Sequence, residues 1–181
     1  MKRKFCEKFP QYKGNTHVIH NGVDAEKFVY QDHPYRSVIG TLGRMDPHKG
    51  VYELIALGAD LQRQNSKLRL VIGGRSTEAR YRRYEEEVRL LVSRLDARDI
   101  IQFSGKVENT PEWLSGVDIF ISSSVSEGLQ VALLEAMACG TPVVAARSGE
   151  IPHVVGDAGL LFPEDDHRAL AAQLAELMRE V

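Results

Sequence analysis

Two glutamates eight residues apart are the side chains best suited to carry chemistry in this chain. Glu127 lies in a loop, and Glu135 lies within a helix that we expect to begin near residues 128–130. If the intervening residues were helical, the two would be separated by about 12 Å along the axis. The first N–H groups of that helix lie between them and favour an anion such as phosphate. The order carboxylate, anion site, carboxylate suits a sugar, a diphosphate and a ribose.

Glu135 stands in the middle of a very apolar sequence. Residues 131–138 leave the expected helix apolar on nearly every side, so we expect it to be buried, and Gly140 and Pro142 then end it. Burying a carboxylate without partners is costly, so something must bond to Glu135. Its neighbours at three- and four-residue spacing are mostly small and leave room for a ligand's hydroxyl groups: Val131, Ala132, Ala138 and Cys139. The alternative is that a backbone group or an arginine satisfies Glu135 and that Glu127 is an exposed loop residue.

Two cations follow the first expected core strand. Arg44 and Lys49 lie in the loop of residues 43–50, GRMDPHKG, and each could reach a diphosphate held near Gln130. A guanidinium bonds phosphate oxygens in pairs, and an ammonium adds a compact positive charge. The alternative is that both are solvated or that Asp46 pairs with one of them.

Several other classes of site are excluded by missing motifs. No strand is followed by GxGxxG and there is no GxxxxGK[ST], which argues against dinucleotide dehydrogenases and P-loop enzymes. The serines at 122–124 lack the GxSxG setting of a hydrolase. The six histidines show no metal-ligand spacing, and no Asp-x-Asp pair is present. We therefore expect no metal.

Length and composition predict one soluble domain. A chain of 181 residues with a formal net charge of −2 gives no electrostatic case for nucleic acid. Cys6 and Cys139 are too few for a disulfide framework, and no membrane-length apolar run or signal peptide is evident, so we expect a cytoplasmic protein. The basic residues 1–8 could touch an anionic membrane surface, although such a segment more often forms a solvated end.

Strand and helix patterns alternate along the chain. Residues 1–16 read as a linker or tail, and residues 17–181 as one folded domain. We expect strands at residues 17–20, 37–42, 68–72, 100–103, 117–121, 142–146 and 158–162. Helices are expected at 51–64, 77–95, 111–114, 150–155 and 165–180, besides the helix that holds Glu135. This alternation predicts an α/β fold, a Rossmann-like doubly wound parallel sheet with helices on both faces, whose ligands bind at the carboxyl ends of the strands.

Taken in order, several motifs resemble those of retaining nucleotide-sugar glycosyltransferases of the GT-B fold, in the group often called group 1 or family four. Residues 18–24, VIHNGVD, are similar to the family's VIPNGVD linker, with His20 where proline is usual. Residues 43–50 resemble its phosphate loop, and residues 103–107, FSGKV, are similar to its base-reading loop. Residues 127–142 are similar to its E-x7-E signature, whereas residues 148–153, SGEIPH, match its GGIPE motif only loosely.

The resemblance implies roles for two of these loops. Arg44 and Lys49, beside Gly43, would hold the diphosphate of the donor and would be catalytic, because positive groups aimed at the leaving diphosphate stabilise its developing charge. The backbone around Lys106 and Val107 would meet the base.

The same resemblance implies roles for the signature helix. Glu127 would contact the transferred sugar as a catalytic residue, without being a nucleophile, and Glu135 would bond the ribose hydroxyls. The sugar and phosphates would also meet a run of four residues before and at the helix start: Gly128, Leu129, Gln130 and Val131.

The family likeness covers almost the whole chain but only the second half of an enzyme. It implies a preceding Rossmann domain that binds an acceptor sugar or lipid, and a nucleotide-sugar donor as substrate without a further cofactor. The isolated chain would then bind the donor weakly and turn it over poorly or not at all. Two alternatives are open: a non-catalytic nucleotide- or sugar-binding module that needs a partner chain, and another GT-B enzyme such as a nucleotide-sugar epimerase or a phosphorylase.

Overall fold

Six short strands form one parallel sheet in the computed structural model, which describes residues 2–62, 67–125 and 128–180. The strands are β1 (Val38–Leu42), β2 (Arg69–Gly73), β3 (Ile101–Gly105), β4 (Ile119–Ser122), β5 (Val143–Ala146) and β6 (Leu160–Phe162). They pair in the order β3-β2-β1-β4-β5-β6, and every neighbouring pair is parallel. All residues of β4 and β5 are buried, as expected for central strands covered on both faces.

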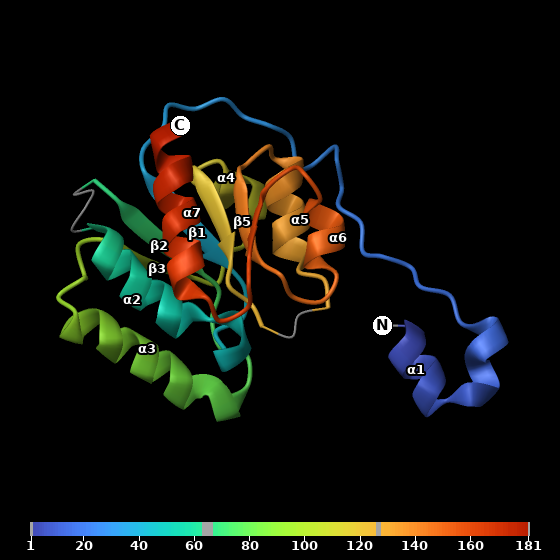
Figure 1. The fold of residues 1–181 in the computed structure, drawn as a ribbon. Helices are drawn as coiled ribbons and strands as arrows, with labels where there is room; N and C mark the ends of the chain where they lie inside the picture. Colours follow the sequence, from blue (N-terminus) through green and yellow to red (C-terminus); the bar gives the residue numbers. More distant parts are fainter. Residues whose placement is uncertain (1, 63–66, 126–127, 181) are drawn as a thin grey trace.

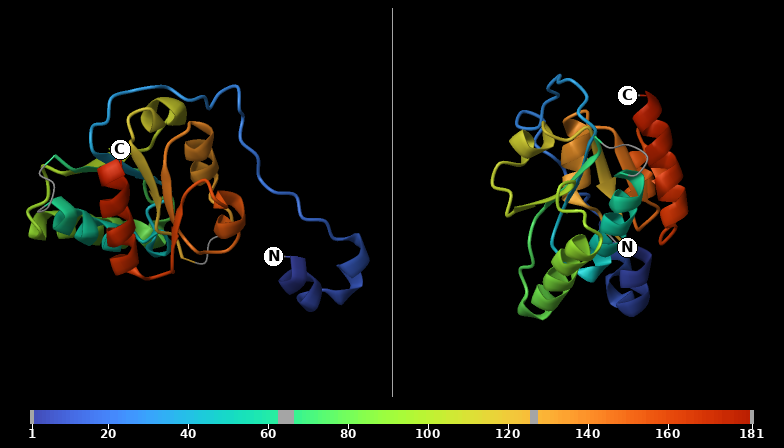
Figure 2. Two further views of the ribbon diagram at one scale, coloured as in Figure 1. Left: turned by 45° about the horizontal axis from the view of Figure 1, so that its top comes forward. Right: turned by 90° about the vertical axis from the view of Figure 1, so that its left-hand side faces the viewer.

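Helices cover both faces of this sheet (Figures 1 and 2). They are α2 (Val51–Gln62), α3 (Arg82–Arg94), α4 (Thr110–Leu114), α5 (Val131–Ala138), α6 (Ile151–Val155) and α7 (His167–Glu180). Residues of α2, α3 and α7 share one buried apolar cluster with the sheet, and residues of α4, α5 and α6 share a second. The predicted doubly wound α/β fold is therefore confirmed.

The strand order reverses between β1 and β4. Chain order runs outward from β1 through β2 to β3 on one side, then continues from β4 to β6 on the other. In a parallel sheet the crevice beside such a reversal, at the carboxyl ends of the strands, is where ligands bind. The loops after β1 and β4, with the start of α5, meet at this point.

Most element boundaries agree with the sequence, with one split helix. The expected helix at 77–95 begins as a single 3-10 turn, η3 (Ala79–Tyr81), before α3. Asp166, one of the two expected caps of the last helix, accepts a hydrogen bond of 2.9 Å from the Ala169 N–H. Asp24, expected to cap a brief helix, instead caps one turn at residues 25–28.

The strand expected at residues 17–20 is wrong. These residues, which belong to the described part of the chain, lie outside any strand, and Ile19 is 92% exposed. Short apolar runs favour strands, but a strand also needs a neighbour to pair its backbone N–H and C=O groups. Among the described residues, no strand pairs with residues 17–20.

Residues 2–16 hold more structure than the predicted linker. They form α1 (Lys2–Lys8) and the 3-10 helix η1 (Pro10–Asn15), and none of these described residues is buried. Phe5 packs on Phe9, with ring centroids 5.1 Å apart. Figure 1 shows this unit away from the sheet and its helices. Contacts within the unit itself therefore hold it together.

The expected burial of α5 holds for only part of its surface. Ala132, Leu133 and Ala136 are buried, but Val131 at its first turn is 43% exposed and Glu135 is half-buried. An apolar sequence shows that a helix can be buried on several sides. The elements that pack around the helix decide which of those sides are buried. One side of α5 therefore stays accessible beside Glu135.

Candidate functional site

The loop after β1 is built to turn tightly into α2. Within it, Pro47–Lys49 forms a 3-10 turn, η2, and the Asp46 carboxylate accepts a 3.0 Å hydrogen bond from the His48 N–H. Gly50 follows in the left-handed conformation with φ 63°, and a side chain there would come within 2.7 Å of the Ser123 carbonyl oxygen. Only glycine fits this close approach, so the loop after β1 is held against the loop after β4.

Further hydrogen bonds join these two loops. The Ser123 hydroxyl donates to the Lys49 carbonyl over 2.8 Å, and the Val125 N–H donates to the His48 carbonyl over 2.8 Å. Because both bonds come from the loop after β4, at Ser123 and Val125, this loop is fixed relative to Lys49.

Lys49 lies where the sequence predicted a diphosphate. A Cβ placed on Gly43 would be 3.6 Å from Lys49 Cε and 3.9 Å from Gln130 Nε2, so these three residues adjoin one another. The Lys49 side chain therefore crosses the end of β1 toward the start of α5. A positive charge at this place, beside the first N–H groups of a helix, suits a phosphate anion.

The Gln130 side chain links two strand ends, a structural role that the sequence did not reveal. Its side chain is buried, its Nε2 donates to the Leu42 carbonyl over 3.1 Å, and its Oε1 accepts from the Ser122 hydroxyl. The side chain thus ties the end of β1 to the end of β4. Because both of its polar ends are engaged within the protein, the backbone of Gln130 is the part suited to face a ligand.

Arg44 is held by carboxylates, as one of the alternatives allowed. Its guanidinium lies 3.5 Å from Asp46 Oδ2 and 3.3 Å from Glu78 Oε1. Asp46 was foreseen as a partner, but Glu78 was missed because it comes from the loop after β2. The Arg44 side chain is mostly exposed, so these ion pairs are weak and a phosphate could compete for its N–H groups.

Two glycines bring the carboxyl ends of three strands together. The Gly43 N–H donates to Gly73 O over 3.1 Å, and the Gly74 N–H donates to Gly105 O over 2.6 Å. Gly74 has φ 109°, and a Cβ on it would lie 1.7 Å from the Gly43 oxygen. The loops after β1, β2 and β3 can be this close only because glycine occupies that position.

The loop after β3 carries the residues expected to meet a base. Lys106 is exposed and its Nζ lies 2.6 Å from Glu108 Oε1. Val107 packs against the end of β2, with its Cγ2 3.0 Å from a Cβ built on Gly73. This loop lies two strands away from β1 on the same edge of the sheet, a separation that suits the two ends of a nucleotide.

The loop before α5 is linked to the loop after β5. The Glu150 N–H donates to the Gly128 carbonyl over 3.0 Å, and Leu129 next to it is half-buried. Glu127 lies outside the described residues. Gly128 is thus held by the loop after β5. That loop begins the segment of residues 148–153, SGEIPH, which matches the family's GGIPE motif only loosely.

Glu135 occupies the second turn of α5. Burial raises the pKa of its carboxyl group above the usual value, and the positive charge of Lys27 opposes that rise. Burial, and then the negative charge of Glu135, raise the pKa of the Cys139 thiol. Lys27 was not among the predicted site residues, because it is 108 positions earlier in the chain.

One cavity gathers part of the predicted set. Gly43, Arg44, Lys49 and Gln130 line it together, with Ser124 from the β4 loop. Lys106, Val107, Val131 and Glu135 lie outside that lining. Four of the predicted residues therefore line one small cavity at the switch point, and the predicted residues on the loop after β3 and on α5 lie apart from it.

Two further observations bear on the kind of site. Within residues 2–62, 67–125 and 128–180, no group of three histidine, cysteine, aspartate or glutamate side chains is arranged to hold a metal ion. In the same ranges, every helix is too short or too polar to cross a lipid bilayer.

Comparisons with known proteins agree on one family. Residues 36–180 match the family model described as "Glycosyl transferases group 1". The alpha-maltose-1-phosphate synthase of Mycobacterium tuberculosis is 34% identical over 97% of this chain and 50% of its own length. The chain spans about half the length of such curated relatives.

Solved structures share the fold. The C-terminal domain of the group 1 glycosyl transferase LpcC from Francisella tularensis superposes with a TM-score of 0.77 and 25% identity, covering 87% of this chain and 88% of that one. Anabaena HepE in complex with UDP and glucose gives a TM-score of 0.81 at 23% identity over 93% of this chain and 48% of HepE.

Proposed function

This chain belongs to the group 1 glycosyl transferases, and we propose that it is the part of such an enzyme that binds the nucleoside diphosphate sugar. The supporting observation is the placement of Lys49 beside Gly43 and Gln130, where β1 ends and α5 begins. A positive side chain, a glycine-lined approach and the N-terminal end of a helix converge there at the switch point of a parallel sheet.

In this proposal the charged groups act on the leaving diphosphate. Breaking the bond between sugar and phosphate builds negative charge on the diphosphate oxygens. Lys49, Arg44 and the first N–H groups of α5 would stabilise that charge, and they are held in place before the reaction by the loop bonds described above. Glu135 would accept hydrogen bonds from ribose hydroxyls, and Glu127 would contact the sugar.

The finer features of the reaction are proposals of the same kind. We expect transfer with retention of anomeric configuration to an acceptor sugar or lipid held by another domain. Because the chain spans about half the length of its relatives, we expect this part alone to bind the donor weakly and to transfer its sugar poorly. Family membership favours transfer over epimerisation or phosphorolysis. Contact of the basic helix α1 with an anionic membrane surface stays a prediction.

Calorimetric titration with UDP, GDP and ADP tests the proposal. One nucleotide should bind saturably, and both Lys49→Ala and Glu135→Ala should weaken its affinity about tenfold or more, since each removes a charge-assisted hydrogen bond. Lys4→Ala on the detached helix α1 and Glu86→Ala on the exposed side of α3 are matched controls that should bind like the parent chain.

The contrary outcome is equally clear. If the folded chain, checked by circular dichroism, binds none of the three nucleotides, the donor-site proposal is wrong for this chain. A module that needs a partner chain would then be the better reading, and co-purification of a partner would be its signature.

A further inference from the structure

The segment that leads into β1 passes beside α5. We define this segment, residues 24–36, as the strap. It begins at a turn in which Asp24 Oδ1 accepts from the Glu26 N–H over 3.0 Å and from the Lys27 N–H over 3.3 Å. The Phe28 N–H closes the turn on the Asp24 carbonyl over 2.9 Å. The backbone of Lys27 is therefore fixed by its own turn.

Two aromatic residues of the strap pack on the α5 side of the molecule. Phe28 is 6% exposed and belongs to the buried cluster that contains Ala132, Ala136 and Cys139. Ala132 and Cys139 stand three and four residues from Glu135, on the same side of the helix. Tyr30 lies over the end of this helix, because a Cβ built on Gly140 would be 2.7 Å from its ring.

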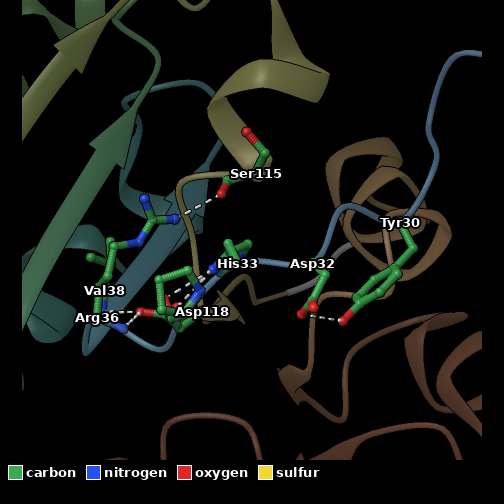
Figure 3. A network of polar contacts seen from close by, with 8 residues as sticks. Tyr30, Asp32, His33, Arg36, Val38, Ser115 and Asp118 are labelled. Carbon is green, nitrogen blue, oxygen red and sulfur yellow. Dashed lines mark hydrogen bonds and ion pairs between the residues drawn. The ribbon is translucent and has the colours of Figure 1, made fainter.

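The other end of the strap is pinned at the start of β4. Asp118 Oδ2 accepts hydrogen bonds from the Arg36 N–H over 3.0 Å and the Val38 N–H over 2.6 Å (Figure 3). His33 Nδ1 lies 3.5 Å from the other Asp118 oxygen, and the Arg36 guanidinium donates to the Ser115 carbonyl over 2.8 Å. Because both ends are anchored, the strap cannot slide along α5.

Lys27 thereby becomes a neighbour of the Glu135 carboxylate. Its Nζ lies 5.4 Å from the centroid of the Phe28 ring, so the side chain runs over a residue packed in the α5 cluster. Its positive charge lowers the pKa of the Glu135 carboxyl group, against the larger rise that burial causes. Among the described residues, Glu135 also acts on the Cys139 thiol, which lies at the C-terminal end of α5.

We propose that Lys27 is a positioning residue for the ribose end of the donor site, where its ammonium group, held beside α5 by the strap, orients the Glu135 carboxylate toward the 2′- and 3′-hydroxyl groups. The inference rests on the proposed function, in which Glu135 accepts from those hydroxyls. An ionised carboxylate is an acceptor at both oxygens, whereas a protonated one must turn a donor toward one of them. The strap would thus be part of the donor site rather than only a connection.

The test compares two ligands that differ only at the ribose. The whole chain is titrated with the nucleoside diphosphate that binds best among UDP, GDP and ADP. A separate titration uses the 2′,3′-dideoxy analogue of the same nucleoside diphosphate. Lys27→Ala should weaken binding of the normal nucleotide about five- to tenfold and leave the dideoxy analogue unchanged. Lys27→Arg should restore most of the lost affinity, because it keeps the charge.

Two further readouts separate this role from a merely structural one. In a Glu135→Gln background, Lys27→Ala should cause no additional loss, since the two residues act on the same contact. As the pH falls, nucleotide affinity should decline when Glu135 takes up a proton. Without the positive charge of Lys27 the pKa of Glu135 should rise further, so this decline should begin at a higher pH in Lys27→Ala.

Several results would overturn the inference. Equal weakening of the normal and dideoxy nucleotides by Lys27→Ala would indicate a general disturbance of the strap. Unchanged affinity for both, or full additivity with Glu135→Gln, would separate Lys27 from the ribose contact. If the parent chain binds no nucleotide at all, the donor site fails as a whole, and that failure is visible before any variant is made.

Discussion

Gly74 is the residue at which the loops after β1 and β2 come closest. Its φ of 109° is a conformation that side-chain-bearing residues rarely adopt, and the missing Cβ would lie 1.7 Å from a backbone oxygen of Gly43. The same Gly43 adjoins Lys49. A methyl group added at Gly74 would therefore press on the backbone of Gly43, which lines the proposed phosphate site.

We predict that Gly74→Ala lowers the free energy of unfolding by more than about 2 kcal/mol, because the strained φ and the collision with Gly43 add together. Urea denaturation followed by circular dichroism measures the change. Gly156→Ala is the matched control: its φ is 50°, but nothing lies within 4 Å of the added Cβ. Equal losses in the two variants would mean that the contact with Gly43 can relax without penalty.

At the scale of elements, Tyr84 joins α3 to the start of α2. The Tyr52 N–H, in the first turn of α2, donates to the Tyr84 hydroxyl oxygen over 3.2 Å. Burial is the main cause that raises the pKa of Tyr84 to about 12, and the nearby carboxylates Glu53 and Asp46 add to it, against two opposing backbone hydrogen bonds. This contact fixes the start of α2, two residues after Lys49.

The raised pKa has a consequence for stability at high pH. The neutral form of Tyr84 is favoured in the folded chain, so its contribution to stability is complete below the pKa of about 10 expected when unfolded. It should be lost progressively as the pH rises from there through about 12. Tyr84→Phe should flatten this part of the stability profile, measured by urea denaturation at a series of pH values. Tyr12→Phe, on the exposed η1, is the control that should leave the profile as it is.

At the scale of the whole molecule, the N-terminal unit of α1 and η1 stands apart from the α/β body (Figure 1). Its aromatic residues contact one another: the ring centroids of Phe5 and Phe9 are 5.1 Å apart, and those of Phe5 and Tyr12 are 6.4 Å apart. These contacts lie within the two short helices α1 and η1. They bury little apolar surface of the rest of the chain.

We therefore predict that deleting residues 2–16 leaves the thermal midpoint and the nucleotide affinity of the remaining chain unchanged. Differential scanning calorimetry and the titration described above measure both. A matched deletion at the other end, removing α7, should abolish cooperative unfolding, because Leu170 and Leu174 are buried in the core cluster. A clear drop in the midpoint on losing residues 2–16 would show that this unit packs on the body in solution.

The sequence by itself determined the α/β alternation, the order of the loops and the positions of the glycines and cations around the proposed phosphate site. These signals are local: β-branched runs, helical periodicity and punctuation by glycine or proline each act within a few residues. The same local signal failed at residues 17–20, because whether an apolar run becomes a strand depends on a neighbouring strand.

Only the tertiary structure decided which distant side chains meet. Glu78 reaches Arg44 across 34 positions, Gln130 reaches Leu42 across 88, and Asp118 reaches the Arg36 backbone across 82. No periodic pattern links such positions, since they become neighbours only when parallel strands bring distant segments together, the first two pairs at the carboxyl ends of the strands and the third at the amino ends. Lys27 acts on Glu135 across 108 positions for a similar reason, because Phe28 and Tyr30 of the strap pack beside α5 before the chain enters β1.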